Sequence, residues 1–136
     1  MAGVLADVGA TDILTAYAAA TTITLRLFAT NVTPTDASTN ASFTEAAGGG
    51  YAAKTLTAGS WTIGDDGGGI KQMAYAQQTF TFTGALTTNG TVYGYELLNG
   101  TTLIGAELLA TPFTPASNGD QLKITPVIKL SKGTPT

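Results

Sequence analysis

Apolar and polar residues alternate with a period of two along most of this chain, which is the pattern of strands that bury one face. In residues 21–29, Ile23, Leu25 and Leu27 alternate with threonines and an arginine. Phe80 and Phe82 alternate with threonines in the same way, and the alternation then continues almost unbroken to residue 108. With its turn-forming residues at short intervals, the pattern predicts about seven short strands, as in a β-sandwich or barrel.

The period changes to that of a helix only near the N-terminus. Ile13, Leu14, Tyr17 and Ala18 fall at helical spacing, and Thr11 or the next residue is a suitable N-cap. We therefore expect one short helix over residues 11–20. Residues 1–10 and 131–136 are expected to be extended terminal arms of a single domain that spans residues 1–136.

Turn signals divide the remaining pattern. Asn89-Gly90 and Asn99-Gly100 predict tight hairpins, because Asn and Gly tolerate the positive φ of primed turns. Residues 31–42 form a polar loop whose Thr, Ser and Asn side chains offer hydrogen bonds to the nearby backbone. Pro126 interrupts the last apolar strand and cannot donate to a ladder, so that strand is expected to be an edge strand or bulged.

These elements together predict an all-β protein, a jelly-roll-like β-sandwich with one short N-terminal helix. Its 136 residues carry a net charge of −3, and only 11% of them are charged, against about 25% in average soluble domains. Either the surface is polar without charge, or other subunits cover much of it. The six Lys and Arg residues are scattered, which argues against nucleic-acid binding. No apolar run reaches the ~20 residues of a membrane span, so no membrane partner is expected.

Candidate chemistry is sparse. The chain has no histidine and no cysteine, which excludes serine–histidine triads, thiol nucleophiles and histidine-bound metals. Glu96 and Glu107 could form a glycosidase-like carboxylate pair, but each is also simply the polar member of an alternating strand. Asp65 and Asp66 could contribute to a calcium site, although an ordinary turn fits their adjacent positions better. We expect no catalytic residue, no metal and no cofactor.

Aromatic residues provide a second kind of candidate. Tyr51, Trp61 and Tyr75 could bind a sugar, while strand alternation makes core packing the default interpretation. Trp61 lies in a short segment between turns and is expected to serve either the core or an interface. The threonine-rich opposite faces of the strands suit protein–protein burial, which disfavours charged residues.

Several segments resemble one group of proteins. In chain order they are DILTAY, LRLFATNVTPT, FTEAAGGGYAAKTL, VYGYELLNGTTLIGAELL and NGDQLKITPVIKLS. From about residue 12 onward, this order is similar to that of small β-rich structural proteins of tailed bacteriophages, some of which are capsid decoration (cement) proteins. The resemblance implies a jelly-roll-like protein that binds the outer capsid surface as a homo-trimer or other homo-oligomer and stabilises contacts between major capsid subunits. It would be made in the host cytoplasm and located on the virion.

The resemblance defines no site, so the interface is predicted from the loops and tails. The major capsid protein is the expected partner. Contacts are expected in the N-terminal segment, in loop 31–42, in loop 65–69 and in the C-terminal tail. The candidate interface residues are Asn31, Thr35, Asp36, Trp61, Asp65, Asp66 and Lys132. The alternative is a phage tail or fibre component with a carbohydrate-binding β-sandwich.

Overall fold

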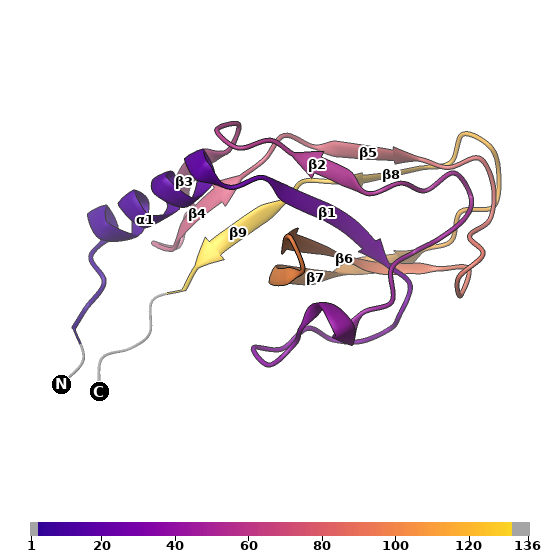
Figure 1. Cartoon of the computed structure of the whole chain (residues 1–136), viewed down its shortest axis with the longest axis horizontal. Coiled ribbons are helices and arrows are strands. Elements are labelled where there is room, and N and C mark those ends of the chain that lie inside the picture. Colours follow the sequence, from indigo (N-terminus) through magenta and orange to yellow (C-terminus); the bar gives the residue numbers. More distant parts are fainter. Residues whose placement is uncertain (1–2, 132–136) are drawn as a thin grey trace. The chain divides into compact units, whose positions relative to one another are not determined.

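The fold was analysed in a computed structural model that describes residues 3–131. It is mostly β, with one N-terminal α-helix, and its strands form three sheets (Figure 1). The chain divides into two compact units. Of the described residues, 3–22, 57–77 and 125–131 belong to one, here called the helix unit, and residues 23–56 and 78–124 belong to the other, the sheet unit.

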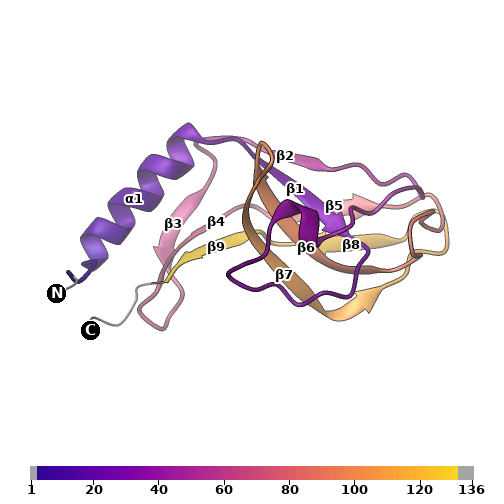
Figure 2. The same ribbon diagram turned by 60° about the horizontal axis from the view of Figure 1, so that its bottom comes forward.

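The helix unit consists of helix α1 (Asp7–Ala20) and a three-stranded antiparallel sheet of order β3-β4-β9. The strands are β3 (Thr62–Asp65), β4 (Lys71–Ala74) and β9 (Val127–Leu130). Figure 2 shows α1 lying along this sheet, and its contacts are with β3 and β4. Three residues spaced four apart are buried along α1: Ala10, Leu14 and Ala18. This single stripe of small and aliphatic side chains is what attaches the helix.

The helix differs from its prediction at the N-terminal end. It begins at Asp7, so residues 7–10, expected in an extended arm, are helical. The additional turn buries Ala10 completely, which extends the packed stripe by one step. Ile13, expected on the apolar face, is 51% exposed, whereas Leu14 is buried. The C-terminal arm lies outside the described residues except for Ser131.

The sheet unit contains a four-stranded antiparallel sheet of order β2-β1-β6-β7 and a two-stranded sheet of β5 and β8 (Figure 1). Their bounds are β1 (Ile23–Phe28), β2 (Lys54–Leu56), β5 (Gln78–Thr81), β6 (Val92–Asn99), β7 (Thr102–Phe113) and β8 (Gln121–Ile124). Ring contacts connect the two sheets. Tyr51 stacks on Phe80 with centroids 5.9 Å apart, and Phe82 lies 5.6 Å from Phe113.

One face of the four-stranded sheet forms the main core. Ile23, Leu25 and Leu27 of β1 are completely buried, together with Leu56 of β2 and Leu97 of β6. Burying one such side chain stabilises the fold by about 1.5–3 kcal/mol. The alternating apolar residues of β1 therefore do what the sequence predicted.

The opposite face is also covered, by the segment of residues 29–50. This segment contains the short 3₁₀ helix η1 (Asn40–Ser42), and it places Phe43 against Phe28 with ring centroids 4.5 Å apart. Backbone hydrogen bonds attach it to the end of β1, with Ala46 N donating to Leu27 O at 2.8 Å. The strand expected to bury only one face is thus enclosed on both, because the polar loop folds back over it.

Of the two predicted hairpins, one is confirmed. β6 and β7 are joined by a two-residue turn in which Gly100 has φ 61°, so Gly100 and Thr101 are the central residues. The prediction of a hairpin at Asn89-Gly90 is wrong, because the flanking strands do not pair with each other: β5 pairs with β8, and β6 pairs with β1 and β7. Both residues have positive φ, as expected, but they form a bend in which the Asn89 amide donates to Ala29 O at 3.0 Å.

Pro126 divides the last predicted strand into two. β8 ends at Ile124, β9 begins at Val127, and the two strands pair in different units. Pro126 itself is buried, and its carbonyl accepts a hydrogen bond from Tyr75 N at 2.9 Å. The missing N–H was correctly expected to disturb the ladder, and its effect is to end one sheet and start another.

Candidate functional site

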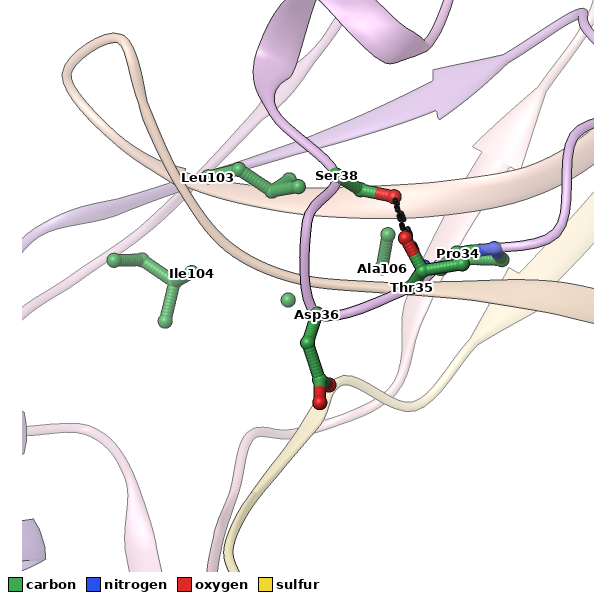
Figure 3. A pocket seen from close by; sticks show the side chains of 8 residues that line it. Pro34, Thr35, Asp36, Ser38, Leu103, Ile104 and Ala106 are labelled. Atoms are coloured by element: carbon green, nitrogen blue, oxygen red, sulfur yellow. Dashed lines mark hydrogen bonds between the residues drawn. The ribbon is translucent and has the colours of Figure 1, made fainter.

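A groove in the sheet unit lies between a loop and the edge strand β7 (Figure 3). Its volume is about 450 Å³, within the range of ligand-binding clefts. From the loop it is lined by Pro34, Thr35, Asp36 and Ser38, and from β7 by residues 103–106. Two of the predicted interface residues, Thr35 and Asp36, therefore lie together at this groove.

The loop side of the groove is a compact turn. Thr35 N donates to Ser38 Oγ at 2.9 Å, and Ser38 N donates to Thr35 O at 3.0 Å. A second such pair follows, with Thr39 N donating to Ser42 Oγ at 3.0 Å. The predicted side-chain-to-backbone bonds of this loop are confirmed, and they fix its shape without a ladder.

The strand side of the groove is an open sheet edge. Within the described part of the chain, β7 pairs only with β6. Leu103 and Ala106 pair with Leu98 and Glu96 and share their face, and the register shift between them makes Ile104 a bulged residue. The groove therefore lies on the loop side of β7, next to its open edge. No atom lies within 4 Å of the position that a Cβ on Gly105 would take. Because side chains stand out of the sheet plane, this open space lies on the face that Gly105 shares with Leu97.

The groove is acidic. No lysine or arginine lines it, and Asp36 is exposed there, without an ion pair to any residue from 3 to 131. Glu107, also on β7, is exposed and accepts a hydrogen bond from Tyr95 Oη at 2.7 Å. Burial raises the pKa of Tyr95 above its ordinary value, and the adjacent Glu107 raises it further. The tyrosine therefore stays a neutral donor and leaves the negative charge of Glu107 uncompensated.

A second polar cluster lies under the loop, and Glu96 is its fully buried member. Glu96 has no exposed surface, and its Oε1 accepts from Arg26 Nη2 at 2.5 Å and from Arg26 Nε at 3.0 Å. The same guanidinium donates to Glu45 at 3.2 Å and to the side chain of Asn40. Burial raises the pKa of Glu96, while Arg26 opposes that shift. The cluster connects the covering segment to β1 and β6.

The two glutamates considered as a catalytic pair lie on opposite faces of the sheet. Glu107 is the register partner of Tyr95, and Tyr95 precedes Glu96 along β6. Because neighbouring residues of a strand alternate between faces, Glu107 shares the face of Tyr95 and Glu96 points the other way. A glycosidase needs both carboxyl groups about 5–10 Å apart on either side of one bond, and this geometry does not supply them.

Asp65 and Asp66 shape a turn in the helix unit. Asp65 Oδ1 accepts from Gly67 N at 2.8 Å, and Asp66 Oδ1 accepts from Gly68 N at 2.7 Å. Lys71 and Lys129 pair with their other oxygens at 3.3 and 3.1 Å. The turn amides, and then the lysines, hold the pKa of both carboxyls below its ordinary value of 3.8. These aspartates follow the turn interpretation, and residues 3–131 contain no cluster of three metal-ligating side chains.

The aromatic candidates are occupied by packing. Trp61 is 8% exposed in the helix unit and meets Tyr75 edge-on at 5.1 Å. Tyr75 Oη accepts from Thr57 N at 3.1 Å. Tyr51 Oη accepts from Leu27 N at 3.0 Å and donates to Glu45 at 3.1 Å. Its ring borders a hollow of only about 110 Å³.

Two further interface candidates remain. Asn31 is exposed at the start of the loop but does not line the groove. Lys132 lies outside the described residues. The feature that sequence reasoning missed is the β7 side of the groove, because alternation predicts a strand without showing whether it lies at the edge of its sheet.

Comparisons with known proteins give no further guide. No protein-family model, no curated protein and no solved structure matches this chain. Within residues 3–131, no helix has both the length and the apolar character needed to cross a membrane.

Proposed function

We propose that this protein is a structural component of a tailed-bacteriophage virion, a capsid decoration protein that binds the outer capsid surface. The observation that carries the proposal is the open groove along β7, at which two predicted interface residues, Thr35 and Asp36, meet. The low charge density and the resemblance of segment order support it as well. In this role, the chain acts by fitting against neighbouring subunits.

The fold proposed with this function is a jelly-roll-like β-sandwich. Its support is the contact of the β5–β8 sheet with the four-stranded sheet through the Tyr51–Phe80 and Phe82–Phe113 ring pairs. Such pairs of packed sheets enclose a core between their inner faces. The outer face of the larger sheet is occupied by residues 29–50, and the β7 edge is the longer of its two edges.

The mechanism is burial repeated over many copies. An interface of about 1,600 Å² is enough for specific association, although area alone does not set affinity. Subunits that bridge seams of a shell at many equivalent positions gain from multivalency. The proposed partner is the major capsid protein, and the decoration unit is a homo-trimer or other homo-oligomer.

Cryo-electron microscopy of purified particles tests the proposal. The chain is expressed with a small affinity tag in the host that produces the particle, and the map is compared with that of particles lacking the gene. We expect added density on the outer capsid surface at subunit seams, and earlier rupture on heating when the gene is absent. Density at the tail, or particles without the chain, would contradict the capsid role.

A further inference from the structure

We propose that the β7 groove accepts an extended segment of a partner polypeptide that carries basic residues, which adds to the sheet as a fifth strand. The inference deepens the proposed function by naming the surface that binds the partner. It depends on that function only in assigning the segment to a capsid subunit. Its three supports are the open ladder edge, the empty space beside it and the unbalanced negative charge.

The first support is the length of the open edge. A strand at the edge of a sheet presents unpaired N–H and C=O groups that can pair with another chain. β7 has twelve residues, whereas β2, the other edge of the same sheet, has three. β7 carries no lysine or arginine, but Pro112 lies near its end and its ladder with β6 shifts register at both ends, so the regular open edge is residues 105–108. An added strand would satisfy these backbone groups, as in other cases of strand addition.

The second support is that the place for the strand is already bounded. The turn of Pro34–Ser38 is the second wall of the groove, and internal hydrogen bonds hold it in shape. A groove of about 450 Å³ lies between this turn and residues 103–106 of β7. A peptide backbone can thus approach the β7 edge closely between the strand and the turn.

The third support is charge, and it selects the occupant. Asp36 lies at the groove on the loop side, and Glu107 lies on β7 one residue beyond the groove lining. A second copy of the same edge would bring its own Asp36 and Glu107 and no cation to meet them. A segment with lysine or arginine complements both carboxylates.

The sheet geometry also gives the spacing. Ala106 lines the groove and pairs with Glu96, whereas Glu107 pairs with Tyr95 on the opposite face. Adjacent residues of the added strand alternate between these faces. One basic residue on each face, at adjacent positions of the segment, would therefore lie near the two carboxylates, since directly opposed charges on neighbouring strands attract.

Titration of the purified chain with synthetic peptides tests the inference without any particle. The probe is a short capped peptide of alternating valine and threonine with two adjacent central lysines. One analogue replaces both lysines with glutamate, and another is N-methylated at every residue so that it cannot donate to a ladder. Backbone amide NMR shifts report where each peptide binds and how tightly.

We expect the lysine peptide to shift residues 34–38 and 103–106 selectively. The glutamate analogue should bind at least about fivefold more weakly, the size of effect expected when two surface charge pairs change sign. The N-methylated analogue should produce no shifts in these residues. Equal binding of all three peptides, or no shift with the lysine peptide at millimolar concentration, would overturn the inference.

Two variants separate the groove from general charge. Asp36→Lys should weaken binding of the lysine peptide about fivefold, whereas Asp12→Lys, the same charge change at an exposed position of α1, should leave it unchanged. Ala106→Phe should abolish binding by filling the groove, because Ala106 lies on the face that the loop covers, and the unfolding temperature checks that this variant is folded.

One further result would contradict the chosen occupant. If the β7 amide shifts depend on protein concentration without peptide, and sedimentation shows a dimer that Asp36→Lys strengthens, the edge is taken by a second copy. Loss of peptide binding in a chain that still decorates particles would overturn this inference and leave the virion role intact. Peptide binding by a chain that is absent from particles would overturn the virion role and leave this inference intact.

Discussion

Strands β6 and β7 are adjacent in one sheet and have the same alternating character, yet they have opposite surroundings. Residues 94–98 of β6 are all buried, whereas every residue of β7 is at least partly exposed. β6 has a strand on each side and cover on both faces, because β1 and β7 flank it and residues 29–50 fold over it. β7 has one neighbour among the described residues. What separates them is position in the sheet, which decides whether a strand serves the fold or remains available to a partner.

The glycines of the two strands show the same contrast. A Cβ on Gly94 of β6 would overlap the ring of Phe28 and the carbonyl oxygen of Glu107. A Cβ on Gly105 of β7 would meet nothing within 4 Å. Gly94 is therefore needed for the close packing of β6, whereas the space beside the Cα atom of Gly105 is open. Changes in β6 should therefore cost stability, and changes in β7 should alter binding.

The largest effect is expected from removing Arg26, the partly exposed cation that pairs with the buried Glu96. Arg26→Met leaves Glu96 without its partner in a site closed to water, which should lower the free energy of unfolding by about 3–5 kcal/mol. Chemical denaturation monitored by far-ultraviolet circular dichroism, to which the strands of the sheet unit contribute, measures it.

The matched control is the double variant Arg26→Met with Glu96→Met. Replacing both charges removes the unpaired carboxylate, so the double variant should recover much of the lost stability. A double variant as unstable as Arg26→Met alone would show that the loss comes from detaching the covering segment at Asn40 and Glu45 rather than from the stranded charge.

The two glycines provide the next largest effect. Gly94→Ala should lower stability by about 1–3 kcal/mol, because Phe28 or the β7 backbone must move. Gly105→Ala should raise it by about 0.5–1 kcal/mol, because alanine restricts the unfolded chain more than glycine does. Thermal unfolding of both variants in one buffer tests the pair. Equal effects of the same sign would contradict the contrast between the strands.

A smaller effect is expected from the pH dependence that Glu96 contributes. Its pKa is raised in the folded chain above the ordinary value of 4.5, so the folded state binds more protons than the unfolded state as the pH passes between the two values. The contribution is complete below the unfolded pKa and is lost as the pH rises through the folded one. The stability difference between wild type and Glu96→Gln should therefore be more favourable to wild type at pH 4 than at pH 7. A difference that stays constant with pH would contradict the raised pKa.

The sequence predicted where the strands lie better than it predicted which strands pair with each other. Alternation at Ile23, Leu25 and Leu27 identified a core strand, and Asn99-Gly100 identified the β6–β7 connection, because both signals are local. Asn89-Gly90 carried the same local signal and failed, since pairing depends on strands distant in the sequence. Strand β4 was not predicted, because its residues, Lys71–Ala74, do not alternate between apolar and polar.

The sequence predicted the loop side of the candidate site but not its β7 side, for the same reason. Thr35 and Asp36 were named from the composition of their loop, and the loop does border the groove. The β7 wall could not be predicted, because edge position is a property of the whole sheet. Glu96 and Glu107 looked equivalent as polar members of alternating strands, and only the register places one in the interior and the other at the surface.

The smallest energetic effect is the most direct test of the open edge, and it is read from amide hydrogen exchange. In β6 every amide from 94 to 98 should exchange slowly, because it opens only with the unfolding of the sheet. In the regularly paired residues 105–108 of β7, one amide in two points away from β6, so alternate residues should exchange at rates close to those of an unfolded chain. The lysine peptide should slow these amides and leave β6 unchanged. If every amide of β7 is already as protected as those of β6, the edge is covered in the free protein, and the distinction between the two strands fails.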